Sequence, residues 1–222
     1  LNSIETKEFL SWLQNDNLIL LGTIDFEVNS TKLSNKIGTT KIWQEVKDEI
    51  EDIVKCSASP LYQNQLIILG KINSASLIHT DNLIDYIVVK KFDSSGEYIS
   101  GSIIFGIYNS NMYYHSISNI PILRQKFNFV IGKAGFALSG YNADKLKILM
   151  ESLPREALIQ IDQGDLYCMC LHMLSSMMSK KLKLFIQYDW SSSFLNIIIF
   201  LPRERLTSEI HNMIDCYLAE KF

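Results

Sequence analysis

The sequence predicts an α+β protein in which an antiparallel sheet carries helices on one face. Three observations lead to this class. Strand-like segments at 66–72, 85–92 and 98–108 follow one another without a helix between them, which is typical of antiparallel pairing. The segment between the last two, Asp93-Ser94-Ser95-Gly96, contains turn-forming residues and predicts a long β-hairpin. Apolar residues at helical spacing precede and follow these strands.

The elements before the hairpin follow from the same patterns. Residues 5–14 are predicted as a short helix, and 18–28 as a strand that turns Ile24 and Phe26 inward. A polar stretch with a short strand near 36–38 comes next. Thr40 is the expected cap of a helix whose buried stripe consists of Ile42, Val46, Ile50, Ile53 and Val54.

Helices dominate after residue 109. Asn119 and Pro121 predict the start of one helix, and Gly132 and Gly135 predict its end. Asn142 is the expected cap of a second helix, which Pro154 closes. We expect these two helices to form a connector between two domains.

The last part of the chain returns to a mixture of strands and helices. Asp162 and Asp165 are expected at the start of an apolar helix that ends at residue 179. Strands at 182–188 and 193–201 and a final helix capped by Thr207 or Ser208 predict half of a ferredoxin-like sandwich, with further strands expected beyond Phe222. The final helix is expected to bury a stripe of Ile210, Met213, Ile214, Tyr217 and Leu218.

Composition argues against several classes of protein. The 222 residues carry 21 Lys and Arg against 24 Asp and Glu, so the basic footprint of a nucleic-acid-binding protein is absent. The apolar runs are far shorter than the ~20 residues that span a bilayer, so neither a membrane segment nor a signal peptide is predicted. The four cysteines are expected to stay reduced, and the protein is predicted to be cytoplasmic.

The sequence predicts no catalytic, cofactor-binding or metal-binding residue. Cys168-Met169-Cys170-Leu171-His172 contains metal-ligating side chains, but Cys170 points about 200° away from Cys168 on a helix. We therefore expect buried cysteines and a hydrogen-bonded histidine. Gly132-Lys133-Ala134-Gly135 follows a helix rather than a strand, which favours a helix C-cap over a nucleotide-binding loop. His115 is expected in an exposed loop.

Several strings along the chain resemble one protein family. In order, they are FLSWL, LILLGTIDFEV, DYIVVKKFDSSGEYISG, FGIY, IPILRQK, LMESLPREAL and IIIFLPRERL. They look like segments of the large bacterial NAD-dependent glutamate dehydrogenases. The similarity is to the non-catalytic N-terminal part of those long subunits, and it covers nearly the whole chain.

The resemblance implies a regulatory or scaffolding region of three parts. These are a PAS-like α+β domain at 1–118, a helical connector at 119–162 and a partial ACT-like module, itself ferredoxin-like, at 163–222. The dehydrogenase chemistry of the family resides in a later region, so NAD is implied for the parent enzyme and no cofactor for this chain. The implied partners are the remainder of the same long subunit and further copies in a homo-oligomer. An amino-acid effector is a further possible partner.

Four residues match charged positions of the family's motifs. They are Arg155, Glu156, Arg203 and Glu204, and the resemblance makes them candidates for an effector site or a subunit interface. The alternative, which we favour, is an ion pair at the end of an element, worth about 0–1 kcal/mol if exposed. Other positions depart from the family, which tends to carry charged residues where this chain has Ala75, Thr80, Ser102 and Ile104.

The sequence is compatible with two functions. The first is a non-catalytic regulatory or assembly segment of an NAD-specific glutamate dehydrogenase, whose whole subunit converts L-glutamate, NAD and water to 2-oxoglutarate, ammonium and NADH. The alternative is a stand-alone PAS-like and ACT-like small-molecule sensor or dimerisation module. A reading frame that continues far beyond Phe222 would favour the first.

Overall fold

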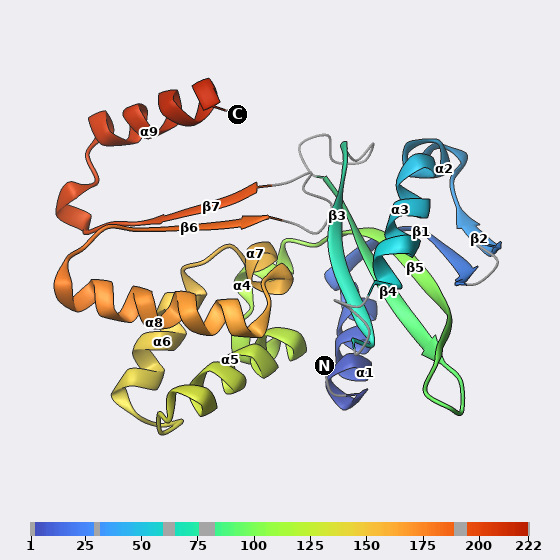
Figure 1. Cartoon of the computed structure of the whole chain (residues 1–222), viewed down its shortest axis with the longest axis horizontal. Coiled ribbons are helices and arrows are strands. Elements are labelled where there is room, and N and C mark those ends of the chain that lie inside the picture. Colours follow the sequence, from blue (N-terminus) through green and yellow to red (C-terminus); the bar gives the residue numbers. More distant parts are fainter. Residues whose placement is uncertain (1–2, 29–31, 60–64, 76–82, 189–194, 222) are drawn as a thin grey trace.

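The computed structural model describes residues 3–28, 32–59, 65–75, 83–188 and 195–221. Within these residues the larger sheet has five strands in the order β2-β1-β5-β4-β3, and all neighbouring strands are antiparallel. This confirms the predicted mixed fold with an antiparallel sheet (Figure 1). The strands are β1 (Leu18–Glu27), β2 (Leu33–Gly38), β3 (Ile67–Ala75), β4 (Leu83–Phe92) and β5 (Tyr98–Tyr108).

The β4–β5 hairpin forms as its turn residues predict. Asp93 Oδ1 accepts hydrogen bonds from the N–H groups of Ser95 and Glu97, both at 2.9 Å. Gly96 takes a positive φ of 84°, a conformation that side chains with a Cβ rarely adopt. The turn therefore fixes the register in which Asp85 faces Gly106.

Helices cover both faces of the sheet, so the prediction of helices on one face is wrong. One face packs against α2 (Thr40–Glu45) and α3 (Lys47–Ser57), with Trp43 beside Phe105 in the core. The other face packs against α1 (Ser3–Trp12) and the helices that follow the sheet. The physical reason lies in β4, where residues 84–88 are all buried and neither face is left to solvent.

The single helix predicted from Thr40 is in fact two helices. Val46 separates α2 from α3, because its ψ of 2° interrupts the helical backbone. Thr39, not Thr40, occupies the N-cap position, and its side chain makes no capping hydrogen bond. The predicted stripe is nevertheless buried at all five positions.

A helical layer follows the sheet. Pro121 begins α5 and Gly135 ends it with a φ of 67°, as predicted, whereas Gly132, also expected at the helix end, lies inside α5. Ile120 and Gly140 hold the N-cap positions expected for Asn119 and Asn142. α6 ends at Glu151 with Ser152 as its C-cap, before Pro154, and Pro154 instead holds the N-cap position of a short further helix, α7, that the sequence pattern does not predict. The helices are α4 (Asn111–Tyr114), α5 (Pro121–Ala134), α6 (Tyr141–Glu151), α7 (Arg155–Gln160) and α8 (Gln163–Ser179).

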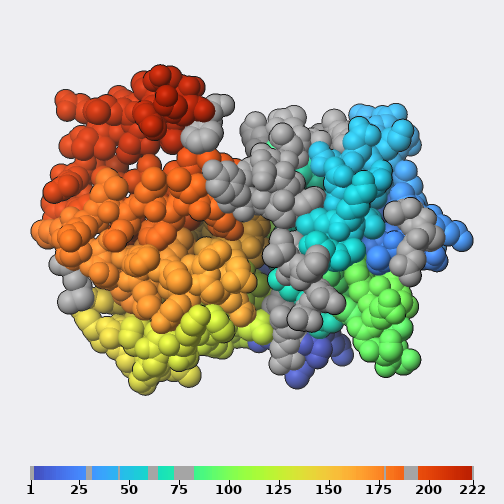
Figure 2. Space-filling view, in the orientation of Figure 1, coloured from blue at the N-terminus to red at the C-terminus, as the bar shows by residue number. Residues whose placement is uncertain are grey.

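A two-stranded sheet and a final helix complete the described chain. β6 (Lys183–Tyr188) pairs with β7 (Leu195–Phe200), and Phe185, Ile198 and Phe200 pack against the core to which α8 contributes. The last helix, α9 (Ser208–Lys221), lies at an outer end of the molecule (Figures 1 and 2). Its predicted buried stripe is wrong, because no described residue of α9 is buried and Met213 is 70% exposed.

Candidate functional site

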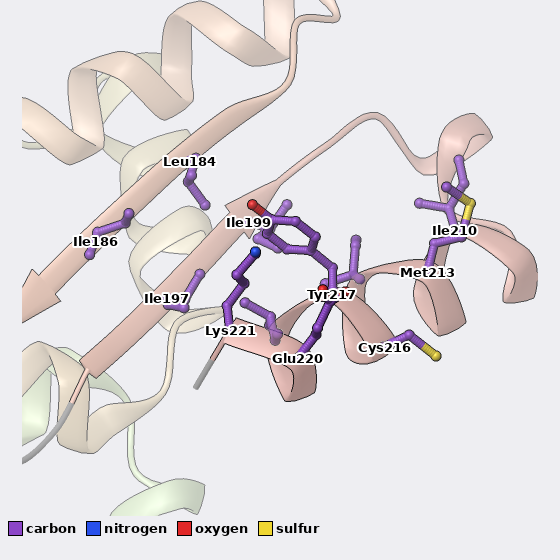
Figure 3. A pocket seen from close by; sticks show the side chains of 12 residues that line it. Leu184, Ile186, Ile197, Ile199, Ile210, Met213, Cys216, Tyr217, Glu220 and Lys221 are labelled. Carbon is purple, nitrogen blue, oxygen red and sulfur yellow. The ribbon is translucent and has the colours of Figure 1, made fainter.

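An apolar groove separates α9 from the β6–β7 sheet. Its volume is about 1100 Å³. Tyr217 and Lys221 point from α9 toward the strands, whereas Cys216 points away from them (Figure 3). The stripe predicted to be buried therefore faces the sheet across an open space. The apolar lining comprises Leu184, Ile186, Ile197 and Ile199 from the strands and Ile210, Met213, Ile214, Tyr217 and Leu218 from α9.

The alternation along β6 explains why the groove is apolar. Phe185 points to the α8 side, while its neighbours Leu184 and Ile186 face the groove and remain 53% and 52% exposed. A strand with apolar residues on both faces is typical of a sheet that is covered on both sides. Here one side is covered by α8 and the other stays open, and an apolar patch of this kind marks a contact surface.

A second feature is a partly buried charge cluster between the five-stranded sheet and α7, in which Asp85 is the most buried member. Lys71 on β3 and Asp85 on β4 are paired in the strand register, and their Nζ and Oδ1 atoms are 2.9 Å apart. The Nζ atom of Lys71 also lies 2.9 Å from Oε2 of Glu156, on α7. The Tyr113 hydroxyl donates to Glu156 Oε1, and the Tyr108 N–H donates to Asp85 Oδ2 at 3.4 Å. Lys71 thus bridges two carboxylates from different elements.

Burial and charge act differently on the members of this cluster. Burial raises the pKa of Asp85 to about 6, against the opposing charge of Lys71. Burial would also raise the pKa of Glu156, but the hydrogen bonds from Tyr113 and Lys71 and the charge of Lys71 hold it below its usual value. Burial would lower the pKa of Lys71, yet Asp85 and Glu156 together raise it. The two carboxylates are therefore not equivalent.

The four candidate residues from the sequence lie in two separate elements. Arg155 is buried in α7, where its Nη1 donates to the Glu151 carbonyl at 3.0 Å, and its Nε has no hydrogen-bond partner among the described residues. Glu156 belongs to the charge cluster. Arg203 and Glu204 lie in an exposed 3-10 turn, and Glu204 pairs with Lys180 at 3.3 Å. Within the described chain, no ion pair joins the two segments.

Lys126 is a buried residue that sequence reasoning missed. Its Nζ donates to the carbonyl oxygens of Leu158, Ile159 and Ile161 at 2.8, 2.6 and 2.6 Å. Burial lowers the pKa of Lys126 to about 7, which the charge of Asp162 opposes. A signal was present, since Lys126 stands four residues after Ile122 and four before Val130, inside the apolar stripe of α5.

The cysteine and histidine expectations are met in part. Cys170 is buried, but Cys168 and His172 are exposed, and His172 stacks on Phe185 with ring centres 6.3 Å apart. His115 is exposed, as predicted. In the part of the chain that the structure describes, no group of three or more His, Cys, Asp or Glu side chains is arranged to hold a metal ion.

The positions that depart from the family motifs have ordinary roles where they are described. Ser102 donates a hydrogen bond to Asp25, and Ile104 packs partly buried against the core. Thr80 and the side chain of Ala75 lie outside the described residues. Among the tryptophans, Trp43 is buried and Trp12 half-buried, while Trp190 is also outside the described residues. No described helix is both long enough and apolar enough to cross a membrane.

The fold and the groove define this chain as an α+β segment with an apolar face left open. Residues 120–177, from the start of α5 into α8, match the family described as "Glutamate dehydrogenase, helical motif 1". The chain is 29% identical to an NAD-specific glutamate dehydrogenase of Halomonas elongata and 23% identical to one of Pseudomonas aeruginosa. Each match covers 98% of this chain and 14% of the relative. The chain is therefore similar to NAD-specific glutamate dehydrogenases of two bacteria, and it spans about a seventh of their length, which confirms the resemblance in the sequence.

Proposed function

We propose that this chain is a non-catalytic regulatory and assembly segment of an NAD-specific glutamate dehydrogenase. The whole subunit would convert L-glutamate, NAD and water to 2-oxoglutarate, ammonium and NADH, with NAD bound outside this chain. The names of the relatives support this reaction. The small share of their length that the chain spans supports a catalytic region elsewhere in the subunit. The free thiols of all four cysteines support a reducing compartment such as the cytoplasm.

In this proposal the chain consists of three structural parts. The sheet with its flanking helices would be the PAS-like domain at 1–118, the helices at 119–162 the connector, and the part at 163–222 the partial ACT-like module. The antiparallel five-stranded sheet and the β6-β7-α9 order support the two module types. Because α8 packs against α5 and α6, the connector and the last module would share one core.

The apolar groove is the observation that carries the assembly role. It leaves apolar side chains of β6, β7 and α9 in solvent, although two strands alone make only a marginal sheet. We commit to one occupant, the remainder of the same long subunit. The matched relatives are long enough to supply it, since this chain spans 14% of their length.

A charge placed in the groove tests this assignment. Ile186→Asp puts a carboxylate on the groove wall, and Ile148→Asp puts one on α6 at a site of similar exposure, 52% against 66%. In the complete subunit encoded by the reading frame of this chain, Ile186→Asp should lower dehydrogenase activity or assembly at least tenfold. Ile148→Asp should change neither by more than about twofold.

Three outcomes are informative. Equal effects of Ile186→Asp and Ile148→Asp would contradict the proposed assembly role of the groove. A concentration-dependent dimer of the isolated chain that Ile186→Asp abolishes would assign the groove to a second copy instead. Turnover of L-glutamate with NAD by the isolated chain would contradict the non-catalytic assignment.

A further inference from the structure

The charge cluster around Lys71 joins four elements that are far apart in the sequence. Lys71 lies on β3, Asp85 on β4, Tyr113 on α4 and Glu156 on α7, and Tyr108 at the end of β5 faces the same small cavity. The cavity has a volume of about 130 Å³. Lys71 is the only described cation within ion-pair distance of either carboxylate, so it alone links the sheet electrostatically to α7.

The charges in the cluster do not balance when both carboxylates are ionised. One ammonium then faces two carboxylates. The other titratable groups that face them, Tyr108 and Tyr113, are neutral at physiological pH, and burial raises their pKa values further above the ordinary value of 10. Asp85 is only 3% exposed, so water screens the excess negative charge poorly. Uptake of one proton would bring the cluster to neutrality.

The contacts decide which carboxylate takes the proton. Glu156 accepts a hydrogen bond from the Tyr113 hydroxyl in addition to its contact with Lys71. Among the described residues, the only hydrogen-bond donor to Asp85 besides Lys71 is the Tyr108 N–H, at the long distance of 3.4 Å. The ionised form of Glu156 is therefore better supported than that of Asp85, in agreement with the opposite pKa shifts of the two groups.

We propose that the Lys71–Asp85–Glu156 cluster is a pH-sensitive switch that controls how firmly α7 is held against the sheet. At neutral pH the two carboxylates compete for the Lys71 ammonium. When the pH falls to mildly acidic values, Asp85 takes up a proton from solvent and stops competing. Lys71 then pairs with Glu156 alone, and the contact between β3 and α7 tightens. The switch depends only on the contacts in this chain and stands whether or not the proposed parent enzyme is correct.

The titration of the Asp85 carboxyl carbon, followed by NMR in the full chain, tests the first step. The wild-type midpoint should lie more than two units above that of Asp25, whose pKa is lowered by hydrogen bonds from Ser102 and Asn35. Lys71→Met should move the midpoint of Asp85 upward, because the opposing ammonium is lost. Glu156→Gln should move it downward, because a neighbouring negative charge is lost. A wild-type midpoint below 4.5, or shifts of the two variants in the same direction, would overturn the proposal.

Amide hydrogen exchange in α7 tests the second step. After correction for the intrinsic pH dependence of exchange, protection of α7 should be at least threefold higher near pH 5.5 than near pH 7.5. Asp85→Asn, which is nearly isosteric and cannot ionise, should remove this difference while α3, on the opposite face of the sheet, exchanges as in the wild type. Equal protection of α7 at the two pH values, or a difference that persists in Asp85→Asn, would refute the switch.

Discussion

The Nζ atom of Lys126 lies 2.6 Å from the carbonyl oxygen of Ile161, at the junction between α7 and α8. The same Nζ also reaches the carbonyls of Leu158 and Ile159 near the end of α7. Three donated hydrogen bonds require the protonated ammonium, because a neutral amine has only two N–H groups. A cation at the C-terminal end of a helix also interacts favourably with the helix dipole. One side chain of α5 therefore satisfies the backbone of the α7–α8 junction.

Replacing Lys126 with Met should destabilise the protein. The substitution keeps the apolar stem but leaves buried carbonyl oxygens without a donor, which costs about 1–3 kcal/mol. Urea denaturation followed by circular dichroism measures the loss. Lys133→Met, on the exposed side of the same helix, is the matched control and should cost less than about 1 kcal/mol. Equal losses for the two variants would mean that the three hydrogen bonds contribute little.

The burial of Asp85 predicts an unusual dependence of stability on pH. Because the folded pKa of about 6 lies above the ordinary 3.8, the folded state binds more protons between these values than the unfolded state. The contribution of Asp85 to the free energy of unfolding should therefore fall by about 3 kcal/mol as the pH rises through this window.

Asp85→Asn isolates this contribution, because the variant cannot titrate. The free energy of unfolding of the variant minus that of the wild type should increase as the pH is raised from about 4 to about 7, by up to about 3 kcal/mol. Asp25→Asn is the control, since its pKa is lowered and its relative stability should stay level in that range. If the free energy of unfolding of Asp85→Asn, relative to the wild type, does not change with pH, the raised pKa of Asp85 is contradicted.

Two glycines should respond in opposite ways to a methyl group. A Cβ on Gly70 would lie 2.2 Å from the Tyr86 hydroxyl oxygen, and Tyr86 is buried, so Gly70→Ala should cost about 1–3 kcal/mol. Gly132 lies in α5 with open space around it, so Gly132→Ala should stabilise the helix by about 0.4–1 kcal/mol. Thermal denaturation of the two variants gives the comparison. A stabilising Gly70→Ala would show that Tyr86 moves aside freely.

The two faces of β6 should differ in their effect on stability. Phe185 packs against the core and Leu184 faces the groove, so Phe185→Ala should cost about 2–4 kcal/mol and Leu184→Ala less than about 0.5 kcal/mol in the isolated chain. Chemical denaturation of the isolated chain measures both. A large loss for Leu184→Ala would indicate that the groove is already closed in solution.

Local patterns predicted most of the elements, and tertiary contacts account for the errors. The alternation in β1 and the turn at residues 93–96 are sufficient to predict the strand and the hairpin, because both patterns depend on neighbours in the sequence. The stripe of α9 was recognised correctly as apolar but placed wrongly in the core. Periodicity shows which residues share a face, but it does not show whether a partner covers that face.

The charge cluster lay beyond local patterns for a different reason. Glu156 stands out in the sequence through its place in a family motif, whereas its partners Lys71 and Asp85 lie on strands more than sixty residues earlier. Only the sheet register and the position of α7 bring the three together. Lys126 could have been found, since a charged residue within an apolar stripe indicates a buried polar contact, although not which carbonyls it meets.

The central position of β5 sets the order in which the sheet can be completed on the ribosome. Leu18 of β1 pairs with Tyr108 of β5, whereas β4 and β5 are joined by a tight turn. Of the five strands of this sheet, β1 is synthesised before the others, and it has no central partner until Tyr108 has been synthesised. Contacts between residues so distant in sequence form slowly, so the β4–β5 hairpin is expected to form before β1 pairs with it. The nascent chain consequently leaves the apolar side chains of β1 without their central partner strand while the residues between Glu27 and Tyr108 are being synthesised.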